Sequence, residues 1–296
     1  MNAPRSQRLP VDGWLILDKP IGMTSTHAVS RLKRIFNAKK AGHAGTLDPL
    51  ASGILPVAFG EATKTVPFVQ DGVKAYRFTV RWGIETDTDD ADGRSVQTSD
   101  LRPPINTVAD LLPAFTGTIM QTPPAFSAIK IAGERAYDMA RDGEVVNLAP
   151  RAVTIDALSI VDTTRDETTF VTECGKGTYV RAIARDLGRL LGCFGHISAL
   201  RRTRVGPFEE ADAVTFAALE TSGNGIRDIE DGLRGVPRIS VDPAGAARLR
   251  RGQSVLVRGA DAPLSGAAYA VCAGTVVATG EIESGELQPR RVFANA

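Results

Sequence analysis

The sequence predicts an α+β protein that ends in a small β module. Its 296 residues are enough for about two domains at roughly 150 residues each. Stretches typical of strands alternate with stretches of helical spacing, and the strands are expected at 14–17, 54–59, 76–82, 151–162 and 168–173. After residue 237 the composition changes to short Val, Ala and Gly segments, and no lysine follows Lys176. We therefore expect one domain at 1–237 and a β module at 238–296.

Composition limits the classes of protein and of site that the chain can contain. Hydrophobic residues make up 43% and charged residues 23%, which is enough for a buried core. The net charge of +1 excludes a histone-like or strongly acidic protein. The three cysteines have no Cys-x-x-Cys spacing, so we expect no disulfide framework and no cysteine zinc site, and a reducing cytoplasm fits best. The few histidines leave little for a metal site, and the first residues lack the apolar stretch of a signal peptide.

In the first third of the chain, the strand at 14–17 precedes a helix that Ser25 or Thr26 can cap. The Gly- and Pro-rich stretch 41–53 is expected to be loop throughout. The strands at 54–59 and 76–82 follow, and the acidic stretch 86–93 is expected to be a turn.

The middle of the chain contains a stretch, 121–150, that we expect to form an insertion or flexible loop on the sheet. A helix is expected at 182–191, with Gly192 as its stop. Its inward residues are expected to be Ile183, Leu187, Leu190 and Leu191. Arginines at 181, 185 and 189 are spaced four apart and share one face.

Charge is concentrated in separate parts of the chain. Residues 1–64 have nine Lys or Arg against four acids, and residues 174–208 have seven against one. Residues 85–100 instead have six acids against Arg94. Two basic segments on a nearly neutral protein are able to bind a polyanion on one face, but ordinary solvated helix surface explains them equally well.

The acidic stretch does not match a calcium-binding loop. With Gly93 at position 6 of an EF-hand, Thr88 and Ser99 fall where Asp and a bidentate Glu are needed. A solvated turn is the better interpretation. The string at 60–65, GEATKT, also lacks the spacing of a phosphate-binding P-loop.

The loop at 42–50, GHAGTLDPL, is the strongest candidate for chemistry. Asp48 precedes a proline, which favours an extended backbone, and nearby glycines leave room for a ligand. Taken alone, such an Asp more often caps its own turn. Arg181 is expected, with Tyr179, on one strand face just before a helix begins, where it is able to pair with a loop carboxylate or to lie at the surface. Tyr76 opens a strand and is as easily a core residue.

Taken together, several strings closely resemble the TruB family of bacterial tRNA pseudouridine-55 synthases. They are LILDKPIGMTS (15–25), KKAGHAGTLDPLASGILPVAFGEATK (39–64), KAYRFTVRWGIETDTDDADG (74–93), PPAFSAIKIAGERAY (123–137), CGKGTYVRAIARDLG (174–188) and LRRTRVGPF (200–208). The resemblance implies a pseudouridine synthase fold with a mixed, largely antiparallel sheet flanked by helices and loops. It also implies a PUA-like RNA-binding module, shortened here, at 238–296.

The same resemblance implies the residues of an active site. It makes Asp48 the catalytic aspartate, which Arg181 pairs with and orients. Substrate-binding roles fall to His43, Tyr76, Tyr179 and Leu200, while Lys19 and Pro20 support the active-site floor. The insertion near 121–150 is expected to close on the RNA stem-loop.

The implied reaction is the isomerisation of uridine 55 in the tRNA T-loop. It needs no cofactor and no metal, because no group leaves and nothing is oxidised. A carboxylate that works in a dry pocket must stay ionised, and an arginine suits this purpose because it stays charged and can form a bidentate fork. The expected partner is tRNA, with no membrane, no obligate protein partner and a monomeric state. Two alternatives are a non-catalytic RNA-binding or tRNA-folding factor and a guide-RNA-dependent synthase.

Overall fold

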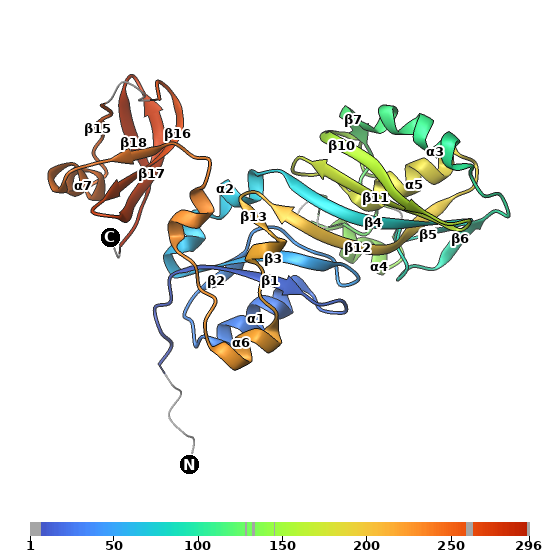
Figure 1. Ribbon diagram of the computed structural model, residues 1–296, viewed down its shortest axis with the longest axis horizontal. Helices are drawn as coiled ribbons and strands as arrows, with labels where there is room; N and C mark the ends of the chain where they lie inside the picture. The colour runs from blue at the N-terminus through green and yellow to red at the C-terminus, as the bar shows by residue number, and fades with distance from the viewer. Residues whose placement is uncertain (1–6, 128, 132–133, 145, 259–262, 295–296) are drawn as a thin grey trace, which may run out of the picture.

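The computed structural model describes residues 7–127, 129–131, 134–144, 146–258 and 263–294. Its main sheet is antiparallel except where β3 and β12 run parallel, with Ser52 and Gly53 opposite Arg201 and Arg202. The prediction of a mixed, largely antiparallel sheet is therefore confirmed (Figure 1). In sheet order, its strands are β1 (Gly13–Lys19), β3 (Ser52–Phe59), β12 (Gly195–Val205), β4 (Lys74–Trp82), β11 (Glu167–Cys174), β10 (Arg151–Thr163) and β7 (Gly117–Gln121), with β2 (Ala41–His43) on β3 and β13 (Phe208–Glu209) on β12.

Helices bury most of the apolar side chains on one face of this sheet. The main core joins alternate residues of β1, β3, β4 and β12 to α1 (Ser25–Ile35), α3 (Ile105–Leu111), α5 (Val180–Leu190) and α6 (Phe216–Ser222). A second cluster, with Trp14, Ile16 and Ile54, packs against the 3₁₀ helix η1 (Gly60–Lys64) and α2 (Val66–Asp71). The strand periodicity of two thus supplies both faces of the N-terminal strands with apolar groups. Among the described residues, no helix is long and apolar enough to cross a membrane.

Two helix ends differ from their predicted positions. Thr24, and neither Ser25 nor Thr26, caps α1, because its hydroxyl accepts a hydrogen bond from the His27 amide at 3.1 Å. In α5 the expected inward residue Leu190 is 65% exposed. The other three expected inward residues, Ile183, Leu187 and Leu191, do pack in or against the core.

The loop predicted at 41–53 is shorter than expected. Residues 41–43 form β2, which pairs antiparallel with 57–59 of β3, and β3 itself begins at Ser52. Only 44–51 lacks regular structure. Glycine and proline did not prevent strand pairing here, because the neighbouring strand offers hydrogen-bonding groups that the local sequence does not reveal.

The acidic turn is not solvated, so that prediction is wrong for its central carboxylates. It connects β5 (Ile84–Thr86) to β6 (Ser95–Thr98), and Glu85, Asp89 and Asp90 are buried. Buried carboxylates need partners. Arginines of α5 supply them, as described below.

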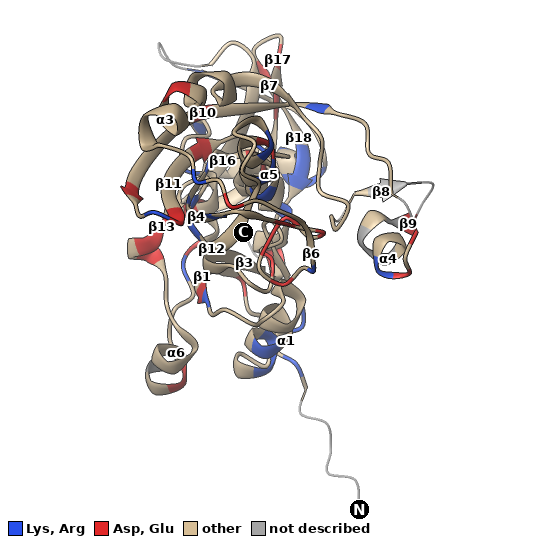
Figure 2. Cartoon of the chain, turned by 90° about the vertical axis from the view of Figure 1, so that its right-hand side faces the viewer, with Lys and Arg blue, Asp and Glu red and all other residues tan. Residues whose placement is uncertain are grey.

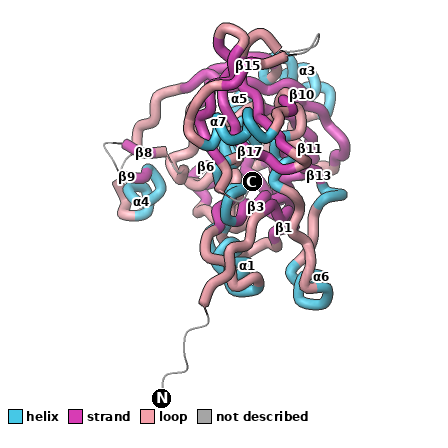
Figure 3. Tube along the Cα trace, turned by 90° about the vertical axis from the view of Figure 1, so that its left-hand side faces the viewer, coloured by secondary structure: helices cyan, strands magenta, loops and turns pink. Residues whose placement is uncertain are grey.

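The segment predicted to be an insertion stands apart from the body of the protein. Its described part contains β8 (Lys130–Ile131), β9 (Glu134–Arg135) and α4 (Ala136–Arg141), which project from the sheet in both side views (Figures 2 and 3). Residues 128, 132, 133 and 145 of the expected insertion lie outside the described residues.

The C-terminal part forms a sheet of its own beside the main sheet (Figure 1). Its order is β14 (Arg238–Ser240), β16 (Gly266–Cys272), β17 (Thr275–Glu283), β18 (Glu286–Val292) and β15 (Val255–Leu256). The sequence interpretation missed α7 (Pro243–Arg250), whose Ala246 and Leu249 pack into the module's separate core. Phe293 and Tyr269 join Leu233 and Phe68 in a small cluster that connects the module to the rest of the chain.

We expect Phe293→Ala to lower the free energy of unfolding by roughly 3 kcal/mol, because the ring is buried in this connecting cluster. Urea denaturation measures the change. Val96→Ala is the control, since Val96 is exposed on β6. Equal midpoints for the two variants would show that Phe293 contributes no docking energy.

Candidate active site

The candidate site lies where rows of core side chains continue into polar ones. On β4, Tyr76 lies next to Phe78 on the same face, and on β12, Arg202 lies next to Leu200. The register pairs Phe78 with Leu200 and Tyr76 with Arg202. Lys19 ends the corresponding row on β1. Because side chains alternate along strands, the sheet itself brings these polar groups to one face.

Asp48 lies in the 44–51 loop between β2 and β3, and Arg181 reaches it from the first turn of α5. Arg181 Nε is 3.1 Å from Asp48 Oδ2. The Arg181 side chain is buried, whereas the Asp48 side chain is 35% exposed. The carboxylate is therefore held by a fixed cation and still accessible from solvent. One detail of the prediction is wrong: Arg181 is helical and not on a strand.

The remaining nitrogens of Arg181 bind other segments. Nη1 donates to the Thr88 carbonyl oxygen at 2.8 Å and lies 3.4 Å from Asp90 Oδ2, while Nη2 donates to the Phe126 carbonyl oxygen at 2.9 Å. Burial raises the pKa of Asp90, and a hydrogen bond from Thr88 and the Arg181 charge oppose that rise. These contacts fix the guanidinium, and through it they fix the direction from which Asp48 is held.

Lys19 places a second positive charge near Asp48. Its side chain is 0% exposed, and Nζ donates to the carbonyl oxygens of Pro20 at 2.9 Å and Met23 at 2.8 Å. Burial lowers the pKa of Lys19 to about 8, the negative charge of Asp48 opposes this, and Arg202 adds to it. Pro20 contributes its carbonyl oxygen, whereas the residue itself is exposed.

Two tyrosines also come close enough to sense the Asp48 charge. Burial raises the pKa of Tyr76, and the Arg202 guanidinium opposes this rise. Burial likewise raises the pKa of Tyr179, which precedes α5 and exchanges two hydrogen bonds with the Gln121 side chain at 2.8 and 3.2 Å. Both phenols therefore stay neutral at physiological pH.

His43 and Leu200 complete the set of predicted site residues. His43 lies on β2, and within the described part of the chain its buried Nδ1 has no hydrogen-bond partner. Burial and the Arg202 charge lower the pKa of His43, so its ring is neutral at pH 7. Leu200 is buried in the main core beside Phe78.

Sequence reasoning missed two residues that support the Asp48 loop. Arg202 is 1% exposed and donates to the carbonyl oxygens of Ile54 at 2.8 Å, Thr46 at 3.2 Å and Gly45 at 3.2 Å, on both sides of Asp48. The Ser25 hydroxyl exchanges hydrogen bonds with the backbone of Leu47 at 2.9 and 3.0 Å. The sequence interpretation predicted no strand at 195–205, so it contained no signal that the Arg202 side chain points inward.

The second basic segment is largely paired within the protein. Arg202 is buried, so for this residue neither alternative offered by the sequence, a polyanion-binding face or solvated surface, is correct. Arg201 binds both oxygens of Asp18 at 3.0 Å and Glu210 at 2.5 Å. Arg204 remains partly exposed, 3.6 Å from Glu173. The first basic segment is more open, with Lys39 and Lys40 exposed beyond α1.

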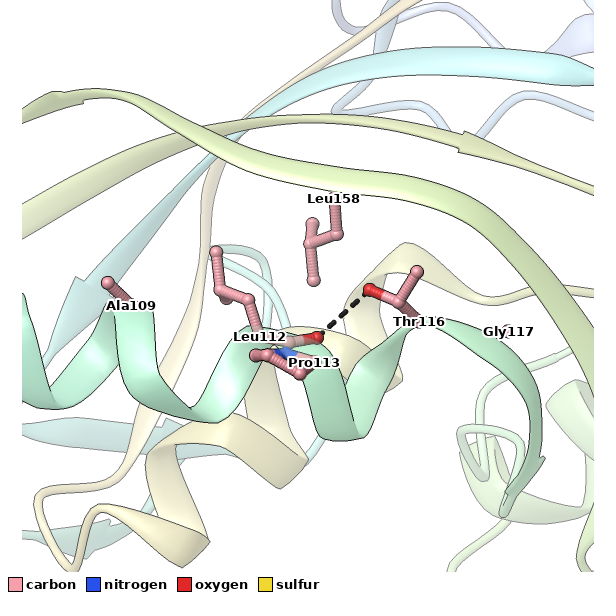
Figure 4. Close-up of a pocket in the computed structure, with 6 residues that line it drawn as sticks. All are labelled: Ala109, Leu112, Pro113, Thr116, Gly117 and Leu158. Carbon is pink, nitrogen blue, oxygen red and sulfur yellow. Dashed lines mark hydrogen bonds between the residues drawn. The ribbon is translucent and has the colours of Figure 1, made fainter.

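One surface pocket lies away from this site. It has a volume of about 640 Å³ beside α3 and β10 and contains none of the predicted site residues (Figure 4). Its lining residues are Ala109, Leu112, Pro113, Thr116, Gly117 and Leu158. Within the described ranges, no group of three or more His, Cys, Asp or Glu is placed to hold a metal ion.

Comparison with known proteins adds family information to this geometry. The family model described as TruB family pseudouridylate synthase, N-terminal domain, matches residues 33–180. The model described as tRNA pseudouridylate synthase B C-terminal domain matches residues 181–234. Together the two models span residues 33–234, including Asp48, Tyr76 and Arg181.

The chain is also similar to proteins named tRNA pseudouridine synthase B. That of Rhodopseudomonas palustris is 58% identical over 303 residues, which cover 98% of this chain and 83% of that protein. That of Bradyrhizobium diazoefficiens is 59% identical over 305 residues, with 99% and 88% covered. A crystal structure of a Cbf5–Nop10–Gar1 complex has a similar fold, with a TM-score of 0.73 and 24% identity over 95% of this chain and 84% of that chain.

We expect Arg202→Lys to raise amide hydrogen exchange in the 44–51 loop by about tenfold. A lysine cannot donate to three carbonyls in different directions, and each lost bond to a charged donor is worth roughly 1.5–3 kcal/mol. Exchange monitored by mass spectrometry on the loop peptide measures the effect. Arg204→Lys, on the same strand but partly exposed, is the control. If both variants exchange like the wild type, Arg202 does not hold the loop.

The lowered pKa of Lys19 predicts a pH-dependent stability. Because the folded pKa of about 8 lies below the ordinary lysine pKa of 10.5, the folded protein loses this proton before the unfolded chain does as pH rises. Relative to Lys19→Met, the wild type should gain about 2 kcal/mol of unfolding free energy between pH 7 and pH 10. Urea titrations at both pH values measure this gain. The exposed Lys39→Met is the control; a Lys19→Met curve parallel to the wild type would contradict the prediction.

Proposed function

The chain belongs to the TruB family of pseudouridylate synthases, and we propose that it converts uridine 55 of the tRNA T-loop into pseudouridine, with Asp48 as the catalytic carboxylate. Pseudouridine synthases are isomerases. The tRNA substrate is proposed from relatives that are named for it and that are more than half identical over nearly the whole chain.

The proposed reaction balances without a cofactor. The glycosidic bond from N1 to C1′ breaks, the uracil turns, and a bond from C5 to C1′ forms. The proton on C5 is lost and N1 gains one, so substrate and product have the same composition. A carboxylate serves this exchange by adding to C1′ or C6, or by stabilising a ribosyl cation.

The observation that supports this role best is the contact between Asp48 and Arg181. A cation 3.1 Å away stabilises the charged carboxylate, while the 35% exposure of Asp48 leaves an oxygen free to meet a substrate. Lys19 adds a second positive charge that is close enough to interact with the Asp48 carboxylate. An isolated Asx-turn, the alternative for Asp48, would need neither cation.

Tyr76 and His43 are proposed to receive the uracil after it leaves its stack. Extrusion of a base costs a few kcal/mol, less in a loop than in a helix. Each flat side chain is able to return roughly 1–3 kcal/mol by stacking. Both rings are neutral at pH 7, since burial raises the pKa of Tyr76 and lowers that of His43. Tyr179 and Leu200 are proposed to line the pocket beneath.

The outer parts of the molecule are proposed to hold the RNA. The projecting insertion closes on the stem-loop, the module at 238–296 acts as a PUA-like RNA-binding unit, and exposed basic residues such as Lys39 and Lys40 contact phosphates. We propose that the chain acts as a monomer without an obligate protein partner. Its three free cysteines suit a reducing cytoplasm.

Asp48→Asn is expected to abolish isomerisation while tRNA affinity stays within about twofold of the wild type. The amide keeps the shape of the side chain and removes the charge that the reaction needs. Tritium release from a C5-labelled transcript measures turnover, and filter binding measures affinity. Asp100→Asn, at an exposed position, is the control. Turnover by Asp48→Asn near the wild-type rate would remove Asp48 from the mechanism.

The wild-type protein tests the proposed substrate. Mapping of the modified nucleotide after incubation with unmodified tRNA should identify position 55. Binding without tritium release would favour the non-catalytic factor. Activity on a bare T-arm hairpin by the purified chain alone would exclude dependence on a guide RNA.

A further inference from the structure

The arginine face of α5 is bound along its whole length to acidic residues of the acidic turn and of β5 just before it. Arg181 contacts Asp90, Arg185 Nη1 lies 3.0 Å from Asp89 Oδ2, and Arg189 binds both oxygens of Glu85 at 2.7 and 2.9 Å. The spacing of four places each arginine one helical turn beyond the last. The helix and the turn therefore form one unit held by three ion pairs.

Two of these arginines also bind the segment that leads into the insertion. Arg185 Nη2 donates to the Thr122 carbonyl oxygen at 2.7 Å, and Arg181 Nη2 donates to the Phe126 carbonyl oxygen at 2.9 Å. At the start of the same segment, Gln121 exchanges two hydrogen bonds with the Tyr179 backbone. We call residues 121–127 the insertion base. It is hydrogen-bonded to two arginines of α5 and to Tyr179, the residue just before α5.

Arg185 is the buried centre of this arrangement. It is 6% exposed, and its third partner is Asp186 Oδ1, 2.8 Å from Nε. Burying a guanidinium is costly unless every donor direction is met, and an apolar side chain often packs at least as stably. The charged form of Asp89 is stabilised by its ion pair with Arg185. Burial raises the pKa of Asp89 to about 6, and the Arg185 charge opposes that rise. What Arg185 provides that an apolar residue cannot is a defined position for both Asp89 and Thr122.

The position of the insertion base affects the orientation of Asp48, because Arg181 contacts both. The Arg181 guanidinium donates to the carbonyl oxygens of Phe126 and Thr88, and its Nε contacts Asp48. A shift of the base by about 1 Å would break the Phe126 contact or turn the guanidinium, and displacements of that size cost roughly 100-fold in rate.

We propose that Arg185 is a positioning residue that fixes the insertion base against α5 and so couples the placement of the insertion on RNA to the orientation of Asp48. The proposal rests on the function proposed above. It assigns no contact with substrate to Arg185.

Arg185→Lys tests the proposal, because lysine keeps the charge but cannot meet Asp89, Asp186 and Thr122 together. The single-turnover rate at saturating tRNA should fall by about 10- to 100-fold, while the dissociation constant for tRNA stays within about twofold. Arg189→Lys is the matched control. It lies on the same face of the same helix and binds Glu85, and its side chain is 55% exposed.

Hydrogen exchange without RNA separates positioning from general stability. In Arg185→Lys, peptides covering 121–127 and 44–51 should exchange faster, whereas peptides of β16 and β17 should not change. Loss of rate with unchanged exchange at 44–51 would overturn the proposal, as would a rate equal to that of Arg189→Lys. Should Arg185→Lys not fold, Asp89→Asn gives the same test: unchanged exchange at 121–127 would overturn the coupling.

The exchange measurement also keeps the two proposals apart. A wild-type protein that makes no pseudouridine would contradict the proposed function. The difference in hydrogen exchange at 44–51 between Arg185→Lys and the wild type would still show that Arg185 affects the Asp48 loop. An active wild type with an equally active Arg185→Lys variant would end the positioning role alone.

Discussion

The buried guanidinium of Arg181 is the contact on which the candidate site depends. A cation removed from water must be met by oxygens, and here the oxygens come from segments far apart in the chain: the Asp48 loop, the acidic turn and the insertion base. Each segment is therefore placed relative to the others by one planar group. The position of the Asp48 carboxylate therefore depends on the other segments, because the cation that holds it is itself held by them.

The sheet supplies the second constraint. Its alternation carries the core rows of β4 and β12 directly into Tyr76 and Arg202, so that the site and the core share one scaffold. The parallel contact of β3 with β12 brings Gly53 against Arg202, where a Cβ on Gly53 would lie 2.2 Å from the Arg202 carbonyl oxygen. Gly53 has φ +99°, a conformation that favours glycine. This close approach lets the Arg202 side chain reach the carbonyls of the loop that contains Asp48.

Much of the positive charge in the second basic segment is paired within the protein. Arginines of the second basic segment are consumed by internal acids, as in the pairs of Arg185 with Asp89 and of Arg201 with Asp18. Such pairs order the protein and leave little free charge for a polyanion. The unpaired positive charge at the surface is thus smaller than the sequence total suggests, and Lys39 and Lys40 beyond α1 are exposed. Charge that appears equivalent in the sequence serves two different purposes in the fold.

The sequence by itself determined the five strands expected at 14–17, 54–59, 76–82, 151–162 and 168–173, the helices α1 and α5 and the identity of the Asp48 loop, because periodicity of two or 3.6 and a long specific motif are local properties. It did not reveal β12, which pairs with both β3 and β4, or the helices α2, α3, α6 and α7. Tertiary structure alone decided that the acidic turn is buried, that Arg202 lies inside and that Arg181 uses one nitrogen for Asp48 and the others for Thr88, Asp90 and Phe126. A charged residue's partner comes from another part of the chain, so its burial depends on which segments meet. No local sequence pattern shows which segments meet in the fold. The free energy of desolvation makes these meetings decisive, because a buried charge is stable only where a partner is present.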